Sequence, residues 1–185
     1  MSDQSKIILN SKQLDLTINR LSFEIIENSK CLEKVAIIGM QPRGVLLSKY
    51  IHAILESETN KSIKHGCLDT TFFRDDFRRR ENVLIPNQTS IDFSLEEIDV
   101  ILIDDVLFTG RSIRSALDAL VSFGRPSSIE LLVLIDRRFS RELPIQPKYI
   151  GKSVDVIDNE HVVVHLNQKN NKVILLNKTN ESFKC

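Results

Sequence analysis

The sequence predicts an α/β fold with a central, mostly parallel sheet flanked by helices, and two observations support this prediction. First, apolar segments of strand length alternate along the chain with longer segments of helical period, an order typical of β-α-β units whose parallel strands are covered on both faces. Second, the 185 residues are enough for one domain with a full core but few for two. We therefore expect a single domain over residues 1–185.

The first part of the chain predicts two helices and two strands. Asn10 and Gln13 have the spacing of a capping pair, and the helix after them carries one apolar stripe, formed by Leu14, Ile18, Leu21 and Ile25. A buried strand over 35–38 ends at Gly39, and a second strand is expected over 64–73. The helix between them, over 45–55, should face the core with Leu47, Tyr50, Ile51 and Ile54.

A polar segment precedes the second part of the chain. Residues 74–94 are charged, contain Pro86 and lack a clean period, which predicts a long mobile loop or a hairpin. Loops of that length inside a compact domain are usually functional. The elements expected around and after it are a strand over 100–103, a helix over 112–123 closed by Gly124 and Pro126, a strand over 129–135, short strands over 154–157, 162–166 and 173–176, and a turn over 167–172. Residues 177–185 are expected to form a frayed tail.

Charge and cysteine content exclude several classes of protein. The 25 basic and 25 acidic side chains balance, so net charge gives no case for nonspecific binding to nucleic acid or to a membrane. Three scattered cysteines do not have the spacing of a disulfide framework or of a zinc site, and they fit a reducing compartment. No signal peptide is visible, and no apolar stretch approaches the roughly 20 residues of a membrane span. We expect a cytoplasmic protein.

Residues 100–112 are the most informative stretch. A buried apolar strand runs into two adjacent carboxylates, Asp104 and Asp105, and a small-residue loop leads to a helix that begins near Ser112. Backbone N–H groups of such a loop, together with the helix dipole, favour a phosphate. The carboxylates can accept hydrogen bonds from vicinal ribose hydroxyls or bind Mg²⁺ through water. A generic strand–turn–helix and a receiver-type acid pair are the alternatives, and neither explains the Thr-Gly-Arg-Ser that follows.

This stretch resembles the 5-phosphoribosyl diphosphate (PRPP) signature of the type I phosphoribosyltransferases. The resemblance implies their fold, which adds a small hood from the terminal segments and a flexible catalytic loop to the central sheet. It also implies Mg²⁺, bound with PRPP, and makes Asp104 and Asp105 catalytic residues that hold the ribose hydroxyls and are candidate metal ligands. The residues expected to cradle the 5′-phosphate are Phe108, Thr109, Gly110, Arg111 and Ser112.

Two further motifs resemble parts of the same family. The loop from Gly39 to Gly44 resembles the one that binds the diphosphate of PRPP, with Pro42, Arg43 and Gly44 as its contacts. Pro42 stands where close relatives carry Thr, and it removes an N–H donor. The segment after Asp69 resembles the flexible catalytic loop, and Arg74 is its expected contact with the leaving diphosphate. A solvated, charged hairpin is the alternative for this segment.

A fourth motif, over 134–144 with 149–152 after it, narrows the match. From about residue 7 to 166 the chain resembles the bifunctional pyrimidine-operon attenuator proteins with uracil phosphoribosyltransferase activity. The resemblance implies the reaction of uracil with PRPP to give UMP and diphosphate, and a homodimer. It also implies that the base contacts the loop after a strand, largely through backbone groups, and assigns this role to Ile135, Asp136, Arg137 and Arg138.

The resemblance weakens at the expected RNA face. Attenuator proteins bind an RNA stem-loop, and their first helix carries Thr-Arg and then His; the matching residues here are Asn19, Arg20 and Phe23. Phe23 and Leu16 should form an exposed apolar strip that suits a protein contact better than RNA. Arg20, Arg141 and Lys152 are the candidate RNA contacts. An RNA-binding regulator that senses UMP or UTP, and an enzyme for another base, therefore stay open as alternatives.

Overall fold

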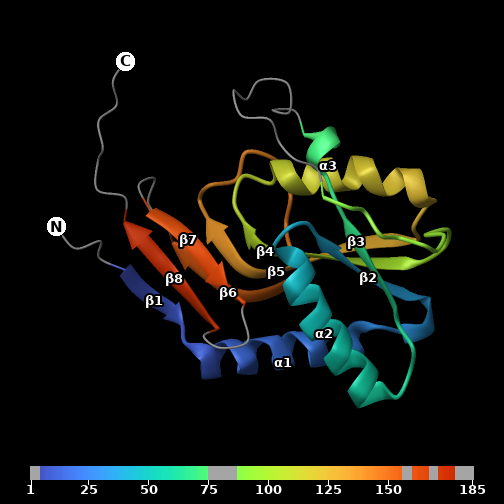
Figure 1. Cartoon of the computed structure of the whole chain (residues 1–185), viewed down its shortest axis with the longest axis horizontal. Helices are drawn as coiled ribbons and strands as arrows, with labels where there is room; N and C mark the ends of the chain where they lie inside the picture. The colour runs from blue at the N-terminus through green and yellow to red at the C-terminus, as the bar shows by residue number, and fades with distance from the viewer. Residues whose placement is uncertain (1–4, 75–86, 156–159, 167–170, 178–185) are drawn as a thin grey trace.

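The computed structural model describes residues 5–74, 87–155, 160–166 and 171–177 (Figure 1). Its centre is a five-stranded parallel sheet in the order β3-β2-β4-β5-β6. The strands are β2 (Val35–Met40), β3 (Lys64–Leu68), β4 (Asp99–Leu107), β5 (Ser128–Arg138) and β6 (Tyr149–Asp155). A parallel sheet needs cover on both faces, and three helices supply it, so the predicted α/β class is confirmed.

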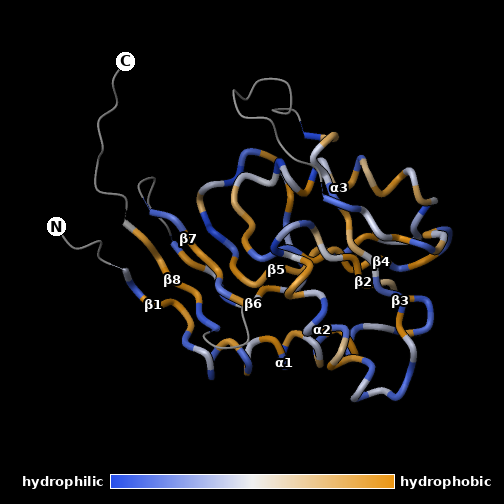
Figure 2. Tube along the Cα trace, viewed as in Figure 1, coloured by the Kyte–Doolittle hydropathy of each residue, from blue (hydrophilic) through white to orange (hydrophobic). Residues whose placement is uncertain are grey.

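Alternate residues of the central strands belong to two separate cores. Ile101 and Ile103 of β4 pack with helices α1 (Ser11–Asn28) and α2 (Gly44–Thr59) on one face. Val100 and Leu102 pack on the other face with α3 (Arg111–Leu120). Figure 2 shows the resulting band of hydrophobic residues through the middle of the domain. The period-2 alternation of a strand thus assigns each neighbouring side chain to a different layer.

Helix α1 begins as the sequence predicts. The Asn10 side chain accepts from the Gln13 amide at 2.9 Å, and the Gln13 side chain accepts from the Asn10 amide at 3.0 Å, which is a complete capping box. The predicted stripe is buried, at Leu14, Ile18, Leu21 and Ile25. In α2 the predicted core residues Leu47 and Ile51 are buried, while Tyr50 and Ile54 pack against the same core with part of their surface exposed.

The two ends of the chain form the hood. Strands β1 (Ser5–Leu9), β8 (Lys172–Asn177) and β7 (Glu160–His165) make a three-stranded antiparallel sheet in that order, at the left of Figure 1. The predicted hood is therefore confirmed, although β1 was not expected from the sequence. Its five residues are too short for a periodic signal, and β8 holds them in place from the far end of the chain.

Several predicted boundaries differ from the structure. The strand predicted over 64–73 ends at Leu68, because Asp69 accepts hydrogen bonds from Thr71 and turns the chain into a 3₁₀ segment, η2 (Thr71–Phe73). The α-helix predicted over 112–123 ends at Leu120, and a second 3₁₀ segment, η3 (Val121–Phe123), follows it before Gly124. Strand β5 continues past the predicted end at 135, and β6 begins well before the predicted 154. A third 3₁₀ segment, η1 (Leu32–Lys34), precedes β2.

Parts of four predictions fall outside the described residues: 75–86 of the polar segment, 156–157 of the strand predicted over 154–157, 167–170 of the turn, and 178–185 of the tail. Where the polar segment is described again, its Ser90 forms an antiparallel bridge with Cys67 of β3. The Cys67 amide donates to the Ser90 carbonyl oxygen at 2.9 Å, and the Ser90 amide donates to the Cys67 carbonyl oxygen at 2.8 Å. Of the described helices, none combines the length and the apolar character needed to cross a membrane.

Candidate active site at the carboxyl ends of the strands

The acid pair lies near the carboxyl end of β4. Asp104 accepts a hydrogen bond from the Asp105 amide at 2.9 Å, and Asp105 accepts one from the Val106 amide at 2.8 Å. Asp104 lines a pocket, whereas Asp105 is buried beside Arg43, whose guanidinium lies 3.9 Å from its Oδ2 atom. That distance is an ion pair rather than a hydrogen bond, and Oδ2 accepts no hydrogen bond from the described residues.

Burial dominates the electrostatics of this pair. It raises the pKa of Asp104 well above its ordinary value, and the negative charge of Asp105 raises that pKa further. Burial also raises the pKa of Asp105, while the charge of Arg43 opposes the shift. Two crowded carboxylates and one buried, unsatisfied oxygen make a site that a hydroxyl donor or a cation would complete.

Close packing of α2 on β4 brings Arg43 to the acid pair. A Cβ atom on Gly44 would lie 2.3 Å from the carbonyl oxygen of Ile103 and 3.0 Å from the Cα of Asp104, so only glycine permits this approach. Arg43 immediately precedes the helix, and the Gln41–Pro42 peptide before it is cis. Arg43 and Gly44 therefore lie beside the carboxylates, and Pro42 directly precedes them. None of the three lines the pocket, and their contact with a diphosphate stays a prediction.

The pocket has a volume of about 280 Å³ and is built on the loop between β4 and α3. Gly110 adopts a φ of 91°, a conformation that favours glycine, and α3 begins at the next residue without a side-chain cap. The first N–H groups of α3 are thus presented at the pocket, where the helix dipole also favours an anion. The lining residues are Arg74, Asp104 and the run from Val106 to Ile113, which includes all of the predicted phosphate contacts: Phe108, Thr109, Gly110, Arg111 and Ser112.

Arg74 shares this pocket. Its guanidinium Nη1 lies 3.4 Å from the hydroxyl of Ser112. In this structure Arg74 is therefore at residues 108–112, called the phosphate loop below after the role predicted for them. Asp69 organises the segment that carries it, since its carboxylate accepts from Thr71 and from the Asn87 amide at 3.2 Å. Asn87, the first described residue after 75–86, is thereby tied to the segment that leads to Arg74.

The predicted base contacts lie on the end of β5, not on a loop, because β6 pairs with β5 as far as Arg138. Ile135 is fully buried in the core, and Arg138 points to Asp155 of β6 with two hydrogen bonds of 2.7 and 2.8 Å. Asp136 and Arg137 are buried next to the phosphate loop, and the Arg137 guanidinium lies 4.0 Å from the centroid of the Phe108 ring. The structure thus brings Asp136 and Arg137, but not the side chains of the other two, to the site.

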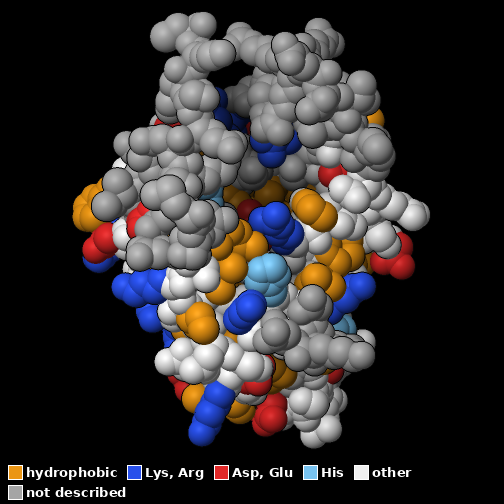
Figure 3. All heavy atoms as spheres, turned by 60° about the vertical axis from the view of Figure 1, so that its left-hand side comes forward, with side chains coloured by type: hydrophobic (Ala, Val, Ile, Leu, Met, Phe, Trp, Pro, Cys, Tyr) orange, Lys and Arg blue, Asp and Glu red, His pale blue; other side chains and the backbone are white. Residues whose placement is uncertain are grey.

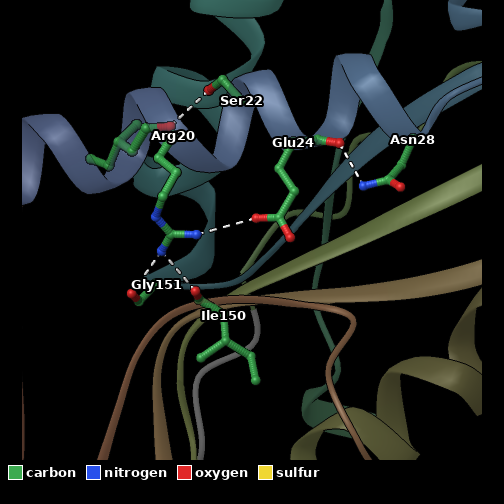
Figure 4. Close-up of polar contacts among 7 residues, drawn as sticks. Arg20, Ser22, Glu24, Asn28, Ile150 and Gly151 are labelled. Carbon is green, nitrogen blue, oxygen red and sulfur yellow. Dashed lines mark hydrogen bonds and ion pairs between the residues drawn. The ribbon is translucent and has the colours of Figure 1, made fainter.

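The three candidate RNA contacts are engaged within the chain at different places. Arg20 donates from Nη2 to the carbonyl oxygens of Ile150 (2.9 Å) and Gly151 (2.8 Å) of β6, and from Nη1 to Glu24 (Figure 4). Lys152 donates to the Ile8 carbonyl of the hood at 3.2 Å. Arg141 binds Asp136 and the Phe108 carbonyl at the active site, a role that sequence reasoning missed.

The surface agrees with this dispersal. On the face drawn in Figure 3, basic side chains stand apart among hydrophobic and uncharged ones and do not form a continuous basic area. The expected apolar strip on α1 is exposed, with Leu16 at 61% and Phe23 at 44% of their full accessibility. The described residues also contain no group of three or more His, Cys, Asp or Glu side chains that could hold a metal ion, so the acid pair would need oxygen atoms from a ligand or water to complete a metal site.

Known proteins match both the sequence and the fold. The profile of the phosphoribosyl transferase domain family matches residues 4–169. The bifunctional protein PyrR of Caldicellulosiruptor bescii is 41% identical over 175 residues, covering 94% of this chain and 96% of its own length. The pyrimidine operon regulatory protein of Lactococcus lactis subsp. cremoris is also 41% identical, over 163 residues that cover 88% of this chain and 91% of its own.

Solved structures match at lower identity and support the fold alone. A hypoxanthine phosphoribosyltransferase of Trypanosoma cruzi has a TM-score of 0.73 with 14% identity, covering 95% of this chain and 93% of its own. One from Staphylococcus aureus has a TM-score of 0.63 with 19% identity over 81% and 78% of the two chains. With the acid pair, the phosphate loop and relatives of about 40% identity over nearly the whole chain, this protein belongs to the phosphoribosyltransferases, and among them to the family of bifunctional PyrR proteins.

Proposed function

We propose that the protein transfers the phosphoribosyl group of PRPP to uracil and releases UMP and diphosphate. The observation that carries the proposal is that the acid pair, near the end of β4, is followed directly by the phosphate loop between β4 and α3. This order matches a ligand with a phosphate at one end of a ribose and hydroxyls at the other. The PyrR relatives favour a pyrimidine over the purines named for the structural neighbours, which at under 20% identity bear on the fold only.

In the proposed complex the chain holds the ribose by its polar groups. Phe108 to Ser112 receive the 5′-phosphate, and Asp104 and Asp105 accept hydrogen bonds from the two ribose hydroxyls. The bond from C1 of the ribose to the diphosphate breaks, a bond to N1 of uracil forms, and uracil loses its N1 proton. The ribose carries oxocarbenium-like charge in between. Arg43 is proposed to stabilise the leaving diphosphate, and orientation and charge stabilisation supply the catalysis.

The residues also fit Mg²⁺. Carboxylate oxygens are the ligands that this ion prefers. Asp104 lines the pocket, and the neighbouring Asp105 Oδ2 is a buried acceptor that receives no hydrogen bond from the described residues. Bound with PRPP, Mg²⁺ would be held through Asp104 and Asp105 and would offset negative charge on the diphosphate. Arg74, close to Ser112, is proposed to contact the 5′-phosphate in this conformation, and its expected contact with the diphosphate stays a prediction.

A base screen tests this function directly. Diphosphate release is measured with PRPP and Mg²⁺ in the presence of uracil, hypoxanthine, guanine or no base. We expect release with uracil only. Release with hypoxanthine and not with uracil would overturn the choice of base, while a lack of release with every base would overturn the transferase itself.

The name of the Lactococcus relative, pyrimidine operon regulatory protein, supports a second function, the regulation of a pyrimidine operon. The resemblance to attenuator proteins implies that such regulation would act through RNA. We propose that this chain binds a pyrimidine-leader stem-loop weakly and with little sequence preference, because Arg20, Arg141 and Lys152 all have partners within the chain. Contacts from other cations to phosphates should then fall steeply with salt. A salt titration with a leader stem-loop and a scrambled one tests this; tight, discriminating binding at physiological salt that UMP strengthens would restore the attenuator role.

The exposed strip on α1 supports a homodimer as part of the same proposal. Leu16 and Phe23 place apolar surface on the helix face away from the core. Light scattering should give a dimer for the wild type and a monomer for the double substitution Leu16→Glu with Phe23→Glu. If the doubly substituted protein is still a dimer, the interface does not include Leu16 and Phe23.

A further inference from the structure

We propose that Arg141 is a positioning residue of the phosphate loop, which it fastens to Asp136 near the carboxyl end of β5. This inference rests on the proposed function, since it concerns how the same site holds PRPP. It starts from two hydrogen bonds of one guanidinium. Nη2 donates to the carboxylate of Asp136, and Nη1 donates to the carbonyl oxygen of Phe108.

One acceptor lies on β5 and the other directly follows the neighbouring strand β4. Asp136 of β5 stands opposite Leu107 of β4 in the parallel ladder, and Phe108 directly follows Leu107. Leu107 is the last residue of β4, so the backbone of the phosphate loop after it has no strand pairing to support it, whereas β5 continues to Arg138. Arg141 therefore spans the junction where β4 stops and the loop begins, and it holds the loop through its first carbonyl.

Neighbours of Arg141 support the same loop. The amides of Glu142 and Leu143 donate to the Thr109 carbonyl at 3.0 and 3.3 Å. Glu142 also pairs with Arg111 at 2.6 Å. The side chain of Ile145 lies against Gly110, so closely that a Cβ there would be 3.2 Å from its Cδ1 atom. Residues 141–145 thus form a backing segment that contacts each loop residue from Phe108 to Arg111.

The backing segment binds the carbonyl groups of Phe108 and Thr109, so the N–H groups of the loop stay available to a ligand. A phosphate is bound through N–H donors, and donors aligned in advance cost less entropy when the ligand arrives. Arg141 also pairs the buried carboxylate of Asp136, since side-chain exposures of 23% and 12% leave the two charges largely out of water. Without the arginine, that negative charge would stand uncompensated near an anion site and would repel the phosphate.

Arg138 provides the matched control. It is the last residue of β5, three residues before Arg141, and makes a comparable pair with Asp155, but this pair is exposed and joins β5 to β6 rather than to the phosphate loop. Loss of its charge changes the net charge of the protein as much as loss of Arg141. A difference between the two variants therefore reports the position of Arg141 and not the charge alone.

The test is calorimetric binding of Mg²⁺–PRPP and of ribose 5-phosphate to the full chain, with steady-state kinetics beside it. Arg141→Ala should weaken both ligands by about tenfold or more, as expected for a lost charge-assisted hydrogen bond. It should raise KM for PRPP and change kcat little, because the loop is held in the ground state and the transition state alike. Arg141→Lys, which can reach only one of the two acceptors, should be intermediate, and Arg138→Ala should bind like the wild type.

Each outcome decides the proposal. If Arg141→Ala is less stable yet binds both ligands as the wild type does, the residue is merely structural and the inference is overturned. If that variant does not fold, Arg141→Lys decides by the same comparison. If the wild type binds PRPP but does not use uracil, the proposed function fails and the loss of PRPP binding in Arg141→Ala still supports the inference. A wild type that binds neither ligand would overturn both.

Discussion

The guanidinium of Arg20 donates a 2.8 Å hydrogen bond to the carbonyl oxygen of Gly151, which fastens the outer face of α1 to strand β6 (Figure 4). Gly151 lies in a tight crossing, because a Cβ atom there would be 2.3 Å from the Leu134 carbonyl oxygen and 3.0 Å from Thr17 of α1. The arginine thus acts at a place where helix and sheet already touch. The position of Arg20 in the sequence suggests a contact with RNA, whereas its hydrogen bonds indicate that it holds α1 against β6.

Replacement of Arg20 by Ala should lower the free energy of unfolding by about 1 kcal/mol, a value reduced from that of a buried charged hydrogen bond because half of the side chain is exposed. Urea unfolding measures it. Lys61→Ala, which removes the surface pair with Glu33, should change stability by less than about 0.5 kcal/mol. Equal effects of the two substitutions would argue against a structural role for Arg20.

Conversion of both Asp104 and Asp105 to Asn should abolish most of the diphosphate release without unfolding the protein. Burial raises both pKa values, so the folded state binds these protons more tightly than the unfolded state does. Stability carried by the pair is therefore lost as the pH rises from the ordinary carboxyl pKa through the raised values. At pH 7 the neutral variant should be as stable as the wild type or more so. Asp99→Asn, at the exposed start of β4, is the control with normal activity.

His65 should make stability depend on pH. Burial lowers its pKa to about 4, with a further contribution from His52 at 4.9 Å between ring centroids. The Ser48 hydroxyl donates its hydrogen to the Val45 carbonyl, so it accepts a hydrogen bond from Nε2 of His65 at 2.9 Å. A neutral imidazole with its proton on Nε2 can donate this bond.

Because the unfolded chain takes up a proton near the ordinary pKa of 6.5 and the folded chain does so only near 4, the contribution of His65 to stability should fall as the pH drops through this window, opposite in sign to that of the acid pair. We expect a loss of about 1–2 kcal/mol, discounted for partial exposure. Urea titrations at pH 7.0, 5.5 and 4.5 measure the slope. His65→Gln should flatten it, whereas the exposed His161→Gln should leave it unchanged; a slope that His65→Gln retains would assign it to other groups.

Mg²⁺–PRPP should raise the melting temperature of the protein. A ligand that binds only the folded state adds about 2.7 kcal/mol at a hundredfold excess over Kd. Differential scanning calorimetry with PRPP, with and without Mg²⁺, measures the shift, and UMP should act in the same direction. Gly110→Ala, which cannot relax into a φ of 91° without strain, should reduce the response. A transition that none of these ligands moves at millimolar concentration would count against the phosphate loop.

The sequence by itself determined the local features of the site. The buried strand, Asp104, Asp105 and Gly110 all lie within one β-turn-α unit. The capping box and the apolar stripe of α1 depend on spacing along a single helix. Each depends on residues only a few positions apart, so local propensity and periodicity are sufficient to predict them.

Only the tertiary structure decided the contacts between distant segments. β1 is a strand because β8 pairs with it, and β5 extends to Arg138 because Asp155 of β6 lies beside that residue. Arg20 and Arg141 carry the same side chain, yet one holds a helix on a sheet and the other supports a phosphate loop. The partner of a long, charged side chain is chosen by which carbonyls and carboxylates the folded backbone leaves within its reach, and that arrangement is absent from any short stretch of the sequence.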